Sequence, residues 1–252
     1  MYISDAASAT VRPSAGELIL SAAAVVIAGV SGAVLFAVAE GGYASFPSLA
    51  THVLFPAVVV LAALALAART LGYRGVLAGL WTGGWIGAVA TIALEIIRII
   101  GFRVFHAMPG SMPMLMGVLL TNRVMQGPDI LSNVVGWADH FWNGATFGMI
   151  YALLFGRVRP WAGPLYGFAV GTGFMVSPVP VALGAGFFGA GMDPGFALTV
   201  YLAHAAFGLV IGVLACRHMP AASGLRRVLS RPDSGHTITT ARHPARPEHG
   251  SR

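Results

Sequence analysis

The sequence contains no lysine, a single cysteine (Cys216) and few charged residues of any kind, since charged side chains make up 10% of its 252 residues. Without lysine, the chain cannot form a Schiff base or a P-loop. One cysteine excludes a disulfide framework and any metal site built from several cysteines. Soluble domains carry about 25% charged residues, so this composition excludes a soluble globular enzyme.

What the chain does contain is long uncharged apolar runs, and hydrophobic residues make up 56% of the sequence. A helix needs about 20 mainly apolar residues to cross a bilayer, where its backbone must satisfy its own hydrogen bonds. The sequence therefore predicts an all-α, polytopic integral membrane protein with about six transmembrane helices. The expected spans are 17–39, 52–70, 76–105, 130–155, 161–187 and 195–216.

Three regions follow from this pattern: a cytoplasmic N-terminal segment (1–16), a six-helix transmembrane domain (17–217) and a basic tail (218–252). The tail is rich in Arg, Ser, Thr, Pro and His and lacks apolar periodicity, so we expect it to be disordered. The net charge of +6 is concentrated in this tail. No folded basic face is visible, and binding to nucleic acid is therefore not expected.

Arginine placement predicts the orientation of the chain in the cell membrane. The connecting segments 40–51 and 186–194 contain no arginine. The arginines at the opposite ends of the spans are Arg12, Arg69, Arg74, Arg157 and Arg159. Because cytoplasmic loops are enriched in basic residues, both termini are expected in the cytoplasm. Arg103 and Arg123 are exceptions that fall near the outer surface.

Two segments have alternative interpretations. The first apolar run ends in Ala37-Val38-Ala39, which resembles a signal-peptide cleavage site. The run is longer than the usual apolar core of a signal peptide, which has about 7–15 residues, and this favours a retained helix.

Between the third and fourth spans, prolines break the helix, and the apolar stretch 113–125 is too short to cross a bilayer. We expect this stretch to be an interfacial or re-entrant segment on the outer side.

Two predicted spans share the pattern H-x3-G-x3-G, beginning at His140 and at His204. Steps of four residues keep the three positions on one helix face. Glycines at this spacing allow helix backbones to approach closely inside a membrane. Both histidines are therefore expected on packing faces, turned away from lipid. Simple packing, with each histidine hydrogen-bonded to a neighbour, is the alternative to a functional role.

Glu95 is a carboxylate well inside the third predicted span, and Arg98 and His106 fall on the same broad helix face. An ion pair with Arg98 that merely balances the charge is one interpretation. Counted from the outer helix ends, Glu95, His140 and His204 lie at similar depths. We therefore expect these three side chains to converge on one buried site. Ionisable groups inside spans are functional candidates.

Several chemistries fit this cluster. Two histidines and a carboxylate can bind iron(II) as metal ligands. His140 and His204 on facing helices could instead bind haem axially. Glutamate and histidine chains also relay protons.

A weaker candidate is a copper site on the outer side, because thioether sulfur suits Cu(I). Its ligands would be His106, Met112, Met114 and Met116.

The sequence leaves three functions open. The first is a redox protein that binds a metal or haem through Glu95, His140 and His204. The second is a proton- or ion-coupled transporter that uses the same residues. The third is a non-catalytic membrane subunit or assembly factor. The expected partners are the lipid bilayer and either another membrane protein or further copies of the chain.

Overall fold

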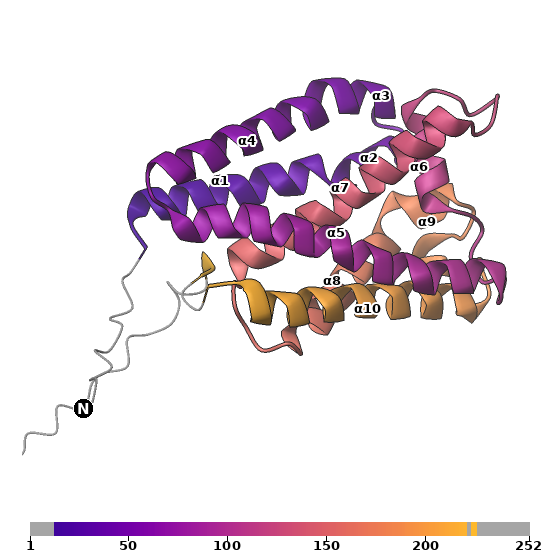
Figure 1. The fold of residues 1–252 in the computed structure, drawn as a ribbon. Helices are drawn as coiled ribbons and strands as arrows, with labels where there is room; N and C mark the ends of the chain where they lie inside the picture. Colours follow the sequence, from indigo (N-terminus) through magenta and orange to yellow (C-terminus); the bar gives the residue numbers. More distant parts are fainter. Residues whose placement is uncertain (1–12, 221–222, 226–252) are drawn as a thin grey trace, which may run out of the picture.

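The computed structural model describes residues 13–220 and 223–225, and every regular element in these ranges is a helix (Figure 1). Residues 1–12 and 226–252 lie outside the described part, so most of the predicted N-terminal segment and basic tail is not tested. In chain order the elements are α1 (Ala15–Ser31), α2 (Ala33–Glu40), α3 (Phe46–Leu49), η1 (Ala50–Leu54), α4 (Phe55–Thr70), α5 (Arg74–Arg103), α6 (Met112–Leu120), α7 (Ile130–Leu154), α8 (Ala162–Val176), α9 (Pro178–Ala182), η2 (Phe187–Gly189) and α10 (Pro194–His218).

Four helical stretches in the described residues are long and apolar enough to cross a membrane: Ala15–Glu40, Phe46–Thr70, Arg74–Arg103 and Pro194–His218. The predicted spans 130–155 and 161–187 are not among these four stretches. α7 has 25 residues but carries several polar side chains, and α8 has only 15 residues. The all-helical fold is thus confirmed and is compatible with a membrane protein, whereas six spans and a re-entrant segment stay predictions.

Proline changes the shape of two predicted spans. The second helical stretch begins at Phe46 rather than at residue 52, and it contains one π-helical turn, Ala50–Leu54, just before Pro56. Proline has no backbone N–H to donate, which favours such a local change of hydrogen-bond pattern. The fifth predicted span stops at Val176, because Pro178 holds Ser177 in an extended conformation with ψ of 168°.

Glycine contacts hold the helices together, as the repeated pattern predicted. A Cβ on Gly148 of α7 would collide with the backbone of Gly83 and Gly87 on α5, and a Cβ on Gly144 would collide with the Thr91 side chain of α5. On α10, Gly208 and Gly212 contact the N-terminal half of α8 in the same way, at Gly163 and Gly167. Both histidine-bearing helices therefore pack backbone to backbone against a neighbour, which is the arrangement small residues allow in membrane proteins.

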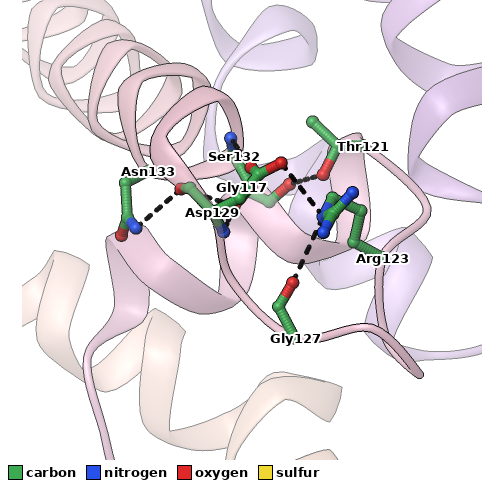
Figure 2. A network of polar contacts seen from close by, with 7 residues as sticks. All are labelled: Gly117, Thr121, Arg123, Gly127, Asp129, Ser132 and Asn133. Carbon is green, nitrogen blue, oxygen red and sulfur yellow. Dashed lines mark hydrogen bonds and ion pairs between the residues drawn. The ribbon is translucent and has the colours of Figure 1, made fainter.

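The connection between α6 and α7 is fixed by a network around Asp129 (Figure 2). The Asp129 carboxylate accepts a hydrogen bond from the backbone N–H of Ser132, and the Ser132 hydroxyl accepts one from the Asp129 N–H, forming a capping box. Arg123 donates to the Gly127 carbonyl oxygen and pairs with Asp129, with nitrogen–oxygen distances of 3.3 Å in each case. α6 and α7 then pack closely through Gly117 and Gly136.

Asp129→Asn is expected to lower the thermal stability of the protein at neutral pH. The hydrogen bond from the Ser132 backbone N–H lowers the pKa of Asp129 below its ordinary value of about 3.9. A lowered pKa in the folded state means that the carboxylate stabilises the protein above pH 4 and that this contribution disappears as the pH falls through the lowered value. The difference in melting temperature between the variant and the wild type should therefore shrink under acid conditions.

Arg123→Gln provides the comparison for Asp129→Asn, because it removes the ion pair and keeps the cap. The side chains of Arg123 and Asp129 are 35% and 38% exposed. Exposed pairs contribute little to stability. Equal losses of melting temperature in the two variants would show that the ion pair, and not the helix cap, gives Asp129 its effect.

Candidate functional site

Glu95 lies at the centre of a buried ionic cluster formed by α5 and α7. Its Oε1 accepts a hydrogen bond from Arg98 Nη1 at 3.1 Å and one from His140 Nε2 at 2.9 Å. The side chains of all three residues are about 10% exposed or less. Arg98 is on the same face of α5 because three residues make nearly one turn. His140 is brought to Glu95 by the close glycine packing of α7 on α5.

The hydrogen bonds fix the roles of the His140 ring nitrogens. Because Nε2 donates to the Glu95 carboxylate, Nδ1 of a neutral ring carries a lone pair, and this buried atom has no hydrogen-bond partner among the described residues. The ring also packs edge-on against Trp137. His140 is therefore a rigidly oriented imidazole with one unused nitrogen.

A second polar pair lies next to the cluster on α7. Asn143 Nδ2 donates to Asp139 Oδ2 at 3.3 Å, and the same nitrogen lies 4.0 Å from the sulfur of Met116 on α6. Asp139 and Asn143 are both buried. Glu95 is therefore not an isolated buried charge. Other buried polar side chains lie on the same two helices, among them Arg98, Asp139, His140 and Asn143.

His204 belongs to a third helix, α10. Its Nδ1 donates to the backbone carbonyl oxygen of Val200, one turn earlier on α10, at 2.8 Å, which leaves Nε2 as an acceptor. Its ring lies beside Phe174, and Gly171 of α8 leaves room for it. Among the described residues, no hydrogen bond or ion pair links His204 to Glu95 or His140.

One cavity joins these groups. It has a volume of about 720 Å3 and lies between α2, α5, α6, α7, α8, α9 and α10. Most of its lining is apolar. The polar or ionisable side chains in its wall are Tyr43, Thr91, Arg98, His140, Asn143, Tyr166, Ser177 and His204. His140 and His204 thus share a cavity, and Glu95 stands behind Arg98 and His140.

The weaker copper set is divided between the cavity and the surface. Met112 and Met116 are buried and line the cavity, as four residues along α6 place them on one face. Met114 is 38% exposed, and His106 is exposed with a left-handed φ of 51°. Met108, from the same stretch of sequence, is the third methionine of the cavity wall.

The described residues contain no group of three or more His, Cys, Asp or Glu side chains placed to hold a metal ion. The Glu95 carboxylate is hydrogen-bonded to both Arg98 and His140. The ligand roles of Glu95, His140 and His204 stay predictions. The cavity itself had no signature in the sequence, because its walls come from helices far apart along the chain.

Comparison with known proteins gave no match to a family model, a curated protein or a solved structure. The geometry of the cavity and of its ionic cluster therefore carries the functional assignment.

Proposed function

We propose that this protein is a cell-membrane transporter with six spanning helices, in which the central cavity binds a small, mainly apolar molecule and the Glu95–His140 pair moves a proton. One observation carries the proposal. A buried carboxylate shared by Arg98 and His140 stands directly behind the wall of a largely apolar cavity of about 720 Å3. Both termini would lie in the cytoplasm.

Two physical arguments support this function. Small-molecule sites have volumes of about 300–1,000 Å3, with apolar walls and few polar groups, and the cavity has both properties. Charged groups inside a membrane are costly and mark ion or proton pathways. Glu95 accepts from a permanently charged Arg98 and from a titratable His140, so a proton on either Glu95 or His140 changes the net charge of the cavity wall.

The test is transport in proteoliposomes that enclose a pH-sensitive dye. Purified full-length protein is first screened by thermal unfolding against a library of small apolar and amphiphilic compounds. Compounds that stabilise it are then tested for uptake. We expect uptake to change the internal pH, and Glu95→Gln to abolish that change while binding persists. Uptake without a pH change in the wild type would contradict proton coupling.

A second function, binding of haem or a metal such as iron or copper by His140 and His204, is favoured by how the two rings are held. Ligand histidines usually donate their other ring N–H to a carboxylate or a backbone carbonyl. His140 donates to Glu95, and His204 donates to the Val200 carbonyl oxygen. In this arrangement Glu95 orients a ligand and is not itself one.

Metal analysis and an absorption spectrum of the detergent-purified protein distinguish the two functions. Stoichiometric haem or metal that disappears in both His140→Ala and His204→Ala would establish the second function. Uptake by protein that contains neither would establish the first. Glu95→Gln adds a further comparison, because loss of an orienting partner lowers metal affinity by about 10- to 100-fold without removing a ligand.

The orientation gives an independent expectation for the six-span topology. A reporter enzyme that works only in the cytoplasm, fused after Arg217, should be active, because α10 would run from the outside to the inside. A second fusion in the segment 186–194, which has no arginine, should be inactive. The reverse pattern would overturn the orientation.

A further inference from the structure

We propose that the molecule bound in the cavity enters from the lipid bilayer, through a side opening between α2 and α8, and that it carries a neutral, oxygen-bearing head group on an apolar body. This inference rests on the proposed function, since it names the entrance and the substrate class of the same cavity.

The packing of α8 creates the side opening. α8 contacts α10, α9 and η2, and α2 contacts α1, α3 and α9, whereas α8 does not pack along α7 or α2. The hydroxyl of Tyr166 on α8 donates to the carbonyl oxygen of Phe147 on α7, which bridges the two helices at one point. Beyond this bridge the cavity is bordered by α2 on one side and α8 on the other.

The residues at this border face outward as well as into the cavity. Val34 on α2 lines the cavity and is 53% exposed. Ala169 and Gly173 on α8 also line it and are exposed. All three are apolar and small or medium in size, and α2 belongs to a helix long and apolar enough to span a membrane. The opening therefore faces the acyl chains of the bilayer and not water.

Polarity increases from the opening inward. α2 and the border of α8 contribute apolar side chains, and the Tyr166 hydroxyl is occupied by its bond to Phe147. Across the cavity, α5, α7 and α10 contribute Arg98, His140 and His204. Tyr43 and Ser177 also line the cavity, but its guanidinium and imidazole groups all lie on α5, α7 and α10, which fits an amphiphile that enters with its head group first.

The charge of the far wall selects a neutral head group. The Arg98 guanidinium is paired with Glu95, so an anionic head group would add an unbalanced charge in a region that is poorly hydrated. Arg98 still has N–H groups beyond the one used by Glu95, and the His204 Nε2 is an acceptor. A hydroxyl or carbonyl oxygen can use these partners without bringing a charge.

The experiment uses the full-length protein in lipid nanodiscs and a photoreactive diazirine analogue of oleyl alcohol. We expect saturable labelling of cavity residues. Unlabelled oleyl alcohol should compete better than oleic acid, which is anionic, and better than octadecene, which has no head group. At fixed total probe, the labelling rate should fall when more lipid dilutes the probe within the bilayer.

Gly173→Phe is the variant that tests the entrance. A Cβ at Gly173 meets no atom within 4 Å, so a side chain can be added there without a clash at its first carbon, and Gly173 lines the cavity at its border. The labelling rate should fall by about tenfold, which corresponds to about 1.4 kcal/mol in the barrier to entry. Val176→Phe is the matched control, because Val176 is exposed on the same helix and does not line the cavity.

Each result that differs from these expectations overturns one part of the proposal. Unchanged labelling in Gly173→Phe, or an equal fall in Val176→Phe, would overturn the side entrance and leave the proposed function standing. Better competition by oleic acid would overturn the neutral head group. If the wild type shows no saturable labelling by the probe while other compounds from the screen are transported, the substrate class is wrong. If nothing binds in the cavity, the proposed function fails as well.

Discussion

Glu95→Leu is expected to destabilise the protein by about 3–5 kcal/mol, which is the cost of removing one partner from a buried ion pair. The substitution leaves Arg98 buried without its carboxylate and His140 Nε2 without its acceptor. Neither side chain can reach water by a small rotation, since each is about 10% exposed or less. The loss can be measured as the shift in the unfolding midpoint of the detergent-purified protein.

The double variant Glu95→Leu/Arg98→Leu separates charge balance from packing. It removes both charges together, and replacing a buried pair by apolar residues is often close to neutral. We expect it to recover more than half of the stability lost in Glu95→Leu, although His140 stays without its acceptor. A double variant as unstable as the single one would show that Glu95 contributes through shape or through His140, and not through Arg98.

Gly148→Leu is the second substitution with a large expected effect, because it acts where two helix backbones touch. A Cβ at this position would lie 2.6 Å from the Gly87 Cα and would also collide with the carbonyl oxygen of Gly83. Backbone atoms of α5 cannot rotate away as a side chain can, so α5 and α7 must separate. Overpacking commonly costs about 1–3 kcal/mol, and we expect this site to lie at or above that range.

Size-exclusion chromatography of the solubilised protein is a direct measurement for Gly148→Leu, which should lose the monodisperse peak. The matched control is Gly173→Leu, since a Cβ there meets no atom within 4 Å. Both substitutions replace a helical glycine by the same side chain, so their difference isolates the helix contact. A normal peak for Gly148→Leu would mean that the close α5–α7 contact is not required for folding.

The same glycine contacts show what could be predicted from the sequence alone. Spacing within one helix is a local property, so H-x3-G-x3-G at His140 and at His204 was enough to place each histidine and its glycines on a packing face. The length and apolarity of the hydrophobic runs were enough to locate the long helices, with corrections at Pro56 and Pro178 where a missing N–H or a steric clash changes the backbone. The short lengths of α8 and α9 needed the structure.

The partners of the buried groups were decided by the tertiary structure. Similar depths suggested that Glu95, His140 and His204 converge, but depth leaves open which helices are neighbours and how each is rotated. The α5–α7 glycine contact brings His140 to Glu95, whereas His204 on α10 donates to the Val200 carbonyl oxygen and lines the same cavity from a third helix. The cavity depends on the packing of seven helices at once, and for that reason the order of residues along the chain determined the helices while only their packing determined the site.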